Sequence, residues 1–144
     1  MQMNPCLSFN GQCEAAFTFY EQCLGGRLGT IFRYEGTPLA DQVPPDWQDK
    51  VMHGSVTVGG LELLGGDVAP DRYEHPSGFS LMLQIKSTTE AERIFLELSE
   101  NGRVTVPLDK TFWAARFGMV VDRFGIPWLI NCDGSDGPPE GQPA

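Results

Sequence analysis

The sequence predicts an α+β fold built from two βαβββ modules, and three observations lead to this expectation. First, two segments that begin near residues 13 and 88 carry apolar residues at helical spacing. Second, each of these helices follows one short β-type run and precedes three more, so the second half of the chain repeats the element order of the first. Third, a loop with two prolines, Gly65–Gly78, divides the chain almost in half.

These modules are expected to form one domain over residues 1–132, with the first module at about 1–66 and the second at about 79–132. In each module a helix covers one face of a mixed sheet, and the two sheets curve around a trough. Concave surfaces of this kind are where small ligands bind. The tail at 133–144, DGSDGPPEGQPA, carries no apolar run and is predicted to be disordered.

The first module begins with a mostly apolar run, Met3–Phe9, which predicts a strand. An apolar stripe over Cys13–Leu24 predicts a helix, and Gly25-Gly26 ends it because glycine tolerates the left-handed conformation. The elements expected next are a strand at Leu28–Tyr34, a long loop at Glu35–Lys50 that is a lid, a binding loop or mobile, a strand at Val51–Val58, a Gly59-Gly60 turn and a strand at Leu61–Leu64.

The second module begins with an alternating run, Phe79–Ile85, which predicts a strand. Ser87-Thr88-Thr89-Glu90 is typical of a capping box at the start of a helix, and Asn101-Gly102 ends that helix. Three further strands are predicted at Val104–Leu108, Arg116–Val121 and Pro127–Cys132, the last two joined as a hairpin.

Composition limits the classes of partner. The chain has 144 residues and a formal net charge of -9, with a sequence pI near 4.5. An acidic chain repels nucleic acids and anionic membranes, so neither is an expected partner. No run of about 18 apolar residues could span a bilayer. The N-terminal segment lacks a basic stretch followed by an apolar one, so we expect no signal peptide and a cytoplasmic location.

The four cysteines are expected to be free thiols, because nothing in the sequence indicates export to an oxidising compartment. None forms a Cys-x-x-Cys pair, so the sequence gives no support for a structural zinc site. Cys13 stands early in a helix, where the helix dipole lowers the pKa of a thiol. It also begins the apolar stripe of that helix, and core packing is the favoured interpretation.

Two motifs resemble one protein family. The opening motif, over Leu7–Tyr20, is L-S-F-N-G-x-C-x-x-A-x-x-F-Y, and the ending motif, over Thr111–Asn131, is T-F-W-x₄-G-x-V-x-D-x-F-G-x-x-W-x-I-N. Both are similar to the PhnB-like branch of the glyoxalase/bleomycin-resistance/extradiol-dioxygenase superfamily, also called vicinal oxygen chelate. The resemblance implies a paired βαβββ fold and a homodimer. Some relatives are labelled demethylubiquinone methyltransferases, but this chain has no Gly-rich strand-to-helix loop to hold S-adenosylmethionine, so we discount that activity.

The resemblance also implies where a metal would bind. Metal-using members hold a divalent ion with side chains from the first and last strands of the modules. The family's glutamate ordinarily lies four residues after the glycine of the last turn, where this chain has Leu129. We therefore expect no cofactor held by the usual ligand set. The alternative is a divalent metal bound by His53 and Glu62 with an unusual third ligand. The first strands offer Asn4, Cys6, Ser8, Ser80, Met82 and Gln84.

His53 is the first of four candidate ligand-binding residues. Strand alternation places it with Ser55 and Thr57, opposite the apolar face that should meet a helix. It is either a ligand, base or donor to a bound molecule, or an ordinary polar residue on the trough face or at a dimer contact.

Phe112, Trp113 and Arg116 complete the candidate set. The two aromatics, with Trp128, either line an apolar pocket or pack in the core or at a dimer contact. Arg116 alternates away from Phe117, which places it on the trough side if Phe117 meets the helices. It then either binds an anionic group or pairs with a surface acid.

Three functions are consistent with the sequence. The first is metal-free binding of a small molecule in the trough. The second is metal-dependent lyase or dioxygenase chemistry, and the third is a non-catalytic role as an interaction protein. The sequence decides neither the identity of the ligand nor whether the protein is an enzyme.

Overall fold

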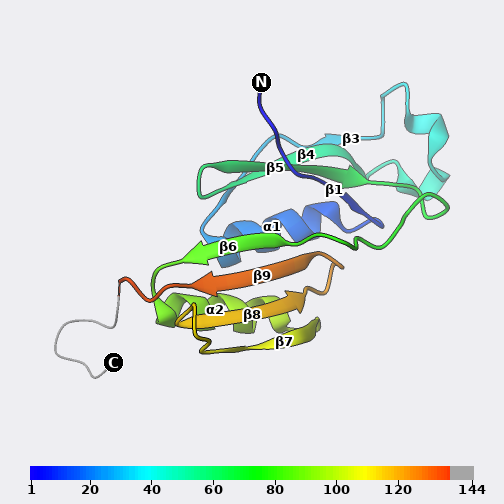
Figure 1. Cartoon of the computed structure of the whole chain (residues 1–144). Helices are drawn as coiled ribbons and strands as arrows, with labels where there is room; N and C mark the ends of the chain where they lie inside the picture. Colours follow the sequence, from blue (N-terminus) through cyan, green and yellow to red (C-terminus); the bar gives the residue numbers. More distant parts are fainter. Residues whose placement is uncertain (137–144) are drawn as a thin grey trace. The chain divides into compact units, whose positions relative to one another are not determined.

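The computed structural model describes residues 1–136 and divides into two compact units, one over Met1–Glu74 and one that begins at His75 (Figure 1). Each unit contains one helix and one curved mixed sheet, in the βαβββ order that the sequence predicts. This confirms the predicted fold class. None of the helices within residues 1–136 has the length and apolar content that a membrane crossing requires.

The first unit packs one helix, α1 (Cys13–Leu24), against its sheet. The strand order is β1-β5-β4-β2, and β3 pairs with β4. β1 runs parallel to β5, and the other pairs are antiparallel. The strands are β1 (Cys6–Phe9), β2 (Arg27–Leu28), β3 (Phe32–Arg33), β4 (Val51–Val58) and β5 (Leu61–Asp67).

Helix α1 has the bounds that its apolar spacing predicts. It buries one face that includes Phe17 and Tyr20, and Phe17 meets Phe9 of β1 edge-to-face with ring centroids 5.6 Å apart. Burying an aromatic side chain of this size stabilises the fold by about 1.5–3 kcal/mol. Gly25 ends the helix with φ 69, and its N–H donates to the Glu21 carbonyl, as expected for a left-handed C-terminal residue.

Strand β5 is longer than predicted, because it continues through two glycines that the sequence assigns to a loop. A Cβ at position 65 would lie 2.7 Å from the carbonyl oxygen of Leu7, and one at position 66 would lie 2.5 Å from that of Met52. Glycine inside a strand commonly marks such a close approach of neighbouring backbones. The strand therefore extends to Asp67 and carries that side chain into the interior.

The carboxylate of Asp67 connects three parts of the first unit. It accepts hydrogen bonds from the backbone N–H of Cys13 and that of Val51, each at 2.9 Å. Gln12, at the N-cap of α1, makes no side-chain cap bond, so Asp67 caps the helix from a distant strand. The Tyr34 hydroxyl donates to the Asp67 carbonyl at 2.5 Å, which attaches the long loop to the same point.

One other prediction for the first unit needs correction. The strand expected at Leu28–Tyr34 is split into β2 and β3, and the pairing with β4 is irregular at Phe32. The loop at Glu35–Lys50 contains two 3₁₀ turns, η1 (Ala40–Gln42) and η2 (Pro45–Trp47), and its role as a lid, a binding loop or a mobile segment stays a prediction. Val43 and Trp47 of this loop pack in a small apolar cluster with Tyr34, Met52 and Ala69.

The second unit has the strand order β6-β9-β8-β7, with β6 parallel to β9 and the other pairs antiparallel. Strands β8 (Arg116–Val121) and β9 (Pro127–Cys132) have the predicted bounds. The remaining elements differ from prediction by at most two residues at an end, and they are β6 (Leu81–Ile85), α2 (Thr88–Ser99) and β7 (Arg103–Asp109).

The start of α2 confirms one half of the predicted capping box. The Ser87 hydroxyl accepts a hydrogen bond from the Glu90 N–H at 3.2 Å. The Glu90 carboxylate pairs with Arg93 instead, one turn along the helix, at 2.6 Å. Past the end of the helix, Asn101 has φ 57, a backbone conformation that asparagine tolerates better than most residues.

A second buried carboxylate organises the β8–β9 hairpin. Asp122 accepts hydrogen bonds from the N–H groups of Phe124 and Ile126, at 2.9 and 3.0 Å. It also accepts from the indole Nε1 of Trp128, at 2.8 Å. Trp128 is thus a core residue, 2% exposed, whose polar atom is satisfied inside the hairpin.

The chain after β9 continues alongside the end of β6. The N–H of Asp133 donates to the Ile85 carbonyl, and the N–H of Asp136 donates to that of Lys86. The remainder of the predicted disordered tail, 137–144, lies outside the described residues.

We expect Asp67→Ala to lower the free energy of unfolding by about 1–3 kcal/mol, because the buried N–H groups of Cys13 and Val51 lose their acceptor. Glu62→Ala in the same strand is the matched control, since Glu62 is exposed, and it should change the free energy by less than about 0.5 kcal/mol. Urea unfolding followed by circular dichroism measures both. Equal losses in the two variants would contradict the role assigned to Asp67.

Candidate functional site

A groove of about 750 Å³ lies on the sheet of the second unit. Its floor is on the face away from α2, because Gly118 packs on the helix side: a Cβ there would lie 2.8 Å from the Phe95 ring. Met119 and Leu129 alternate to the other face and line the groove. The lining residues are Pro76, Ser77, Gly78, Phe79, Ser80, Met82, Thr105, Val106, Met119, Val121, Pro127 and Leu129.

Strand register aligns four apolar side chains across the floor of this groove. Met82 on β6 stands opposite Leu129 on β9, Leu129 stands opposite Met119 on β8, and Met119 stands opposite Val106 on β7. With about 4.8 Å between neighbouring strands, this row is about 14 Å long. The residues that line the groove include hydroxyl groups but no charged side chain.

An amide pair stands next to the row of apolar side chains. Asn131 donates from Nδ2 to Oε1 of Gln84 at 3.0 Å. Gln84 in turn donates from Nε2 to the thioether sulfur of Met82, at 3.1 Å. Because Met82 lines the groove, this contact places the Gln84 amide at the edge of the groove.

Phe112 and Trp113, two predicted ligand-binding residues, lie in the loop between β7 and β8. They are 97% and 54% exposed, so neither is a core residue. Their rings meet edge-to-face at 4.7 Å, and Trp113 meets Phe117 in the same way at 5.3 Å. The two residues form an exposed aromatic cluster with Phe117, and they do not line the groove.

The predicted orientation of Arg116 is wrong. Its Nε donates to a carboxylate oxygen of Glu92 on α2 at 3.1 Å, so the side chain lies on the helix side of the sheet. The prediction assumed that Phe117, Met119 and Val121, which share one face of β8, meet the helix. Both faces of β8 carry apolar residues, and the helix takes the face with Gly118 and Val120, which leaves the other face for the groove.

His53 and Glu62 lie in the first unit, and both are exposed. On the sheet, Glu62 stands opposite Thr57, four residues from His53 along β4. Their Cα atoms are therefore about 13 Å apart along the strand, and residues 1–136 contain no third His, Cys, Asp or Glu placed to complete a site with this pair of one chain. The proposed unusual ligand set therefore does not fit the structure.

The usual ligand set does not fit either. Leu129 stands where the resemblance to metal-using relatives implies a glutamate, and it has no donor atom for a metal. Within residues 1–136, no group of three or more His, Cys, Asp or Glu side chains is placed to hold an ion.

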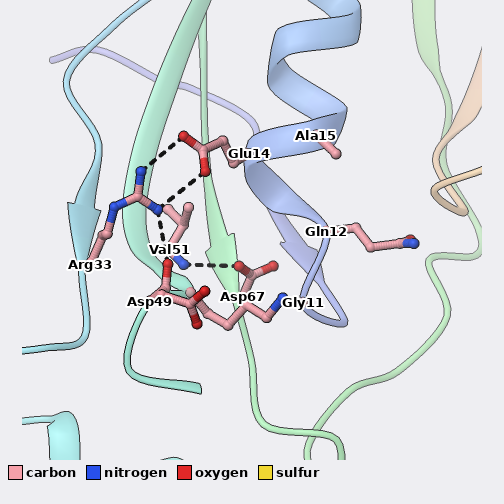
Figure 2. Close-up of a pocket in the computed structure, with 9 residues that line it drawn as sticks. Gly11, Gln12, Glu14, Ala15, Arg33, Asp49, Val51 and Asp67 are labelled. Carbon is pink, nitrogen blue, oxygen red and sulfur yellow. Dashed lines mark hydrogen bonds and ion pairs between the residues drawn. The ribbon is translucent and has the colours of Figure 1, made fainter. Parts of the chain in front are cut away.

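A second cavity, of about 370 Å³, lies beside the first turn of α1, and sequence reasoning missed it (Figure 2). Figure 2 shows the Arg33 guanidinium turned toward Glu14 and Asp49, while Gln12 points away. Arg33 donates to both carboxylate oxygens of Glu14, at 2.9 and 3.2 Å, and to the Asp49 carbonyl at 2.9 Å. Asp67 lies at the base of this cavity.

Two charged groups of this cavity, Arg33 and Glu14, pair with each other, and Asp67 is satisfied by backbone N–H groups. The hydrogen bond from Arg33 lowers the pKa of Glu14. Because both side chains are almost half exposed, such a pair stabilises the fold by at most about 1 kcal/mol. Burial raises the pKa of Asp67, and its backbone hydrogen bonds offset part of that rise. We interpret the cavity as structural, with Asp67 and the Arg33–Glu14 pair joining the sheet to α1.

The buried cysteines do not form a nucleophilic centre. Cys13 is fully buried, and burial, followed by the nearby Asp67 carboxylate, raises the pKa of its thiol. Core packing, the favoured interpretation of Cys13, agrees with this position. Among the four free cysteines only Cys6 is exposed.

The chain is similar to known proteins over most of its length. A family model described as 3-demethylubiquinone-9 3-methyltransferase matches residues 1–131. Protein YjdN of Escherichia coli (strain K12) is 33% identical over 139 residues, which cover 91% of this chain and 95% of that protein.

Solved structures show the same fold. Protein PA1353 from Pseudomonas aeruginosa is 45% identical with a TM-score of 0.83, over 92% of this chain and 98% of that one. The PhnB protein from Bacillus cereus is 22% identical with a TM-score of 0.80, over 92% and 99% of the two chains. The fosfomycin resistance protein FosX from Listeria monocytogenes is 9% identical with a TM-score of 0.60, over 91% of each chain, and shows a likeness of fold alone.

The raised pKa of Asp67 makes a prediction about pH. Because the folded state holds this proton more firmly than the unfolded state, the contribution of Asp67 to stability is fully present below its ordinary pKa of 3.8. It falls as the pH rises toward the folded pKa. We expect the difference in unfolding free energy between wild type and Asp67→Asn to decrease as the pH rises above 3.8. If urea titrations give a difference in unfolding free energy that stays constant or increases with pH, this prediction is wrong. The titration of Glu14 contributes equally to both proteins and cancels from the difference.

Thiol reactivity follows from the burial of the cysteines. We expect one of the four thiols, Cys6, to react rapidly with 5,5′-dithiobis(2-nitrobenzoate) in the folded protein, and all four to react in guanidinium chloride. Cys6→Ser should abolish the rapid phase. A rapid phase that persists in this variant would show that Cys13 or another buried thiol is accessible.

Proposed function

The chain belongs to the 3-demethylubiquinone-9 3-methyltransferase family, a PhnB-like family of the vicinal oxygen chelate superfamily, and from this premise we propose that it binds a small apolar molecule without the superfamily's usual metal ligands. The binding site is the groove of the second unit. Binding, rather than a particular reaction, is the function proposed.

The proposal depends on one observation, the row of apolar side chains on the floor of the groove. Ligand sites commonly have volumes of about 300–1,000 Å³ and mainly apolar walls with a few polar groups. The groove has about 750 Å³, and its row includes Leu129 at the place of the family's metal-binding glutamate. An isobutyl group at this place contributes contact area to a ligand and nothing to a metal.

We do not propose the methyltransferase activity that the family's description names. The connection from β1 to α1 is Asn10-Gly11-Gln12, and that from β6 to α2 is Lys86-Ser87. Neither is a glycine-rich loop of the kind that receives a nucleotide-like cofactor. The homodimer and the cytoplasmic location stay predictions.

Fluorescence titration with N-phenyl-1-naphthylamine, a neutral probe that brightens in apolar surroundings, tests the proposal. We expect saturable binding to the wild type and about tenfold weaker binding to Leu129→Gln, which loses apolar contact on the floor. Leu96→Gln is the matched control, because Leu96 is 74% exposed on α2 and does not line the groove.

Three results bear on the alternatives. Unsaturable fluorescence, or equal affinities for the wild type and Leu129→Gln, would contradict binding in this groove and favour an interaction protein. Stoichiometric divalent metal in protein purified without chelator, measured by elemental analysis, would favour a metal-dependent lyase or dioxygenase.

A further inference from the structure

We infer that the ligand of the groove is a neutral, elongated aromatic molecule that carries one hydrogen-bond acceptor, such as a carbonyl oxygen, directed at the Gln84 amide. This inference rests on the proposed function and names the chemical class of the ligand. Three features of the groove support it, and each limits a different property of the ligand.

The lining of the groove determines that the ligand is neutral. No charged side chain contributes to it, so an ionic group buried there would lose water without gaining a partner. Arg116, on β8, is on the helix side of the sheet and is bonded to Glu92. The net charge of -9 adds long-range repulsion against anions.

The floor of the groove determines that the ligand is elongated and aromatic. The row from Met82 through Leu129 and Met119 to Val106 crosses all four strands and is about 14 Å long. Two of its four side chains are methionines, whose thioethers make favourable contacts with aromatic rings and adapt to their shape. The exposed ring of Phe79, in the wall, offers a further aromatic contact.

The amide pair determines the position of the acceptor. Asn131 donates to Oε1 of Gln84, which directs the Gln84 NH₂ group toward Met82 and the groove. That NH₂ group donates to a thioether sulfur, which is a weak acceptor. A carbonyl oxygen of the ligand is a stronger acceptor, and it can replace the sulfur while the bond between Asn131 and Gln84 stays in place.

Methionine-methyl NMR with three matched probes tests this inference. 2-Acetylnaphthalene has the acceptor, 2-ethylnaphthalene has the same shape without it, and 2-naphthoate is an anion. The ¹³C-methyl signals of Met82 and Met119 report binding in the groove, and that of Met52, in the first unit, is the internal control. We expect both neutral probes to shift the two groove signals, and 2-naphthoate to leave them unshifted.

The contribution of Gln84 is measured by the ratio of the Kd of 2-ethylnaphthalene to that of 2-acetylnaphthalene. We expect Gln84→Leu to lower this ratio about 3- to 10-fold, the worth of one neutral hydrogen bond, with little change for 2-ethylnaphthalene. Gln22→Leu, on the exposed side of α1, should leave the ratio unchanged.

The outcomes separate the inference from the proposed function. If neither neutral probe shifts Met82 and Met119, the groove does not bind such molecules and the proposed function fails with the inference. If both bind and the ratio is the same in Gln84→Leu, or if 2-naphthoate binds as tightly, the ligand class is wrong while binding in the groove stands. Shifts confined to Met52 would overturn both.

Discussion

Two backbone N–H groups from distant parts of the first unit, those of Cys13 and Val51, meet at the buried carboxylate of Asp67. Each would be costly to bury without an acceptor. Because Asp67 is the last residue of β5, its place requires that strand to run through Gly65 and Gly66, where neighbouring backbones leave no room for a side chain. The start of α1, the start of β4 and the loop that carries Tyr34 are thereby attached to one strand end.

In the second unit, buried N–H groups also share one carboxylate, but this carboxylate belongs to the same hairpin as its donors. Asp122 accepts from two N–H groups of its own hairpin and from the indole of Trp128, only six residues away. In this chain the ending motif, Thr111–Asn131, therefore has a structural role. Its aspartate, glycine and tryptophan hold β8 and β9 in the register that aligns Met119 with Leu129 on the floor of the groove.

The two units repeat an element order but differ in the sheet face that the helix leaves open. In the first unit this face carries exposed polar residues such as Ser8, His53 and Glu62. In the second unit it carries a row of apolar side chains with no charge in the groove lining. A fold that serves metal chemistry in other members of the superfamily here offers an apolar surface, and this difference in side chains, rather than the fold, supports binding of a neutral ligand.

The sequence by itself determined the two helices, the strands β4, β8 and β9, and the family, because helix spacing, strand alternation, caps and turn glycines act between residues close in the chain. The resemblance to metal-using relatives also implied a metal-binding glutamate at the position where the chain has Leu129. Only the tertiary structure decided the partner of Asp67, which is 54 residues from Cys13, and the face of the sheet that Arg116 takes. Both depend on contacts between distant segments. When both faces of a strand are apolar, as in β8, alternation cannot say which one the helix covers; the packing of Gly118 against Phe95 decides it.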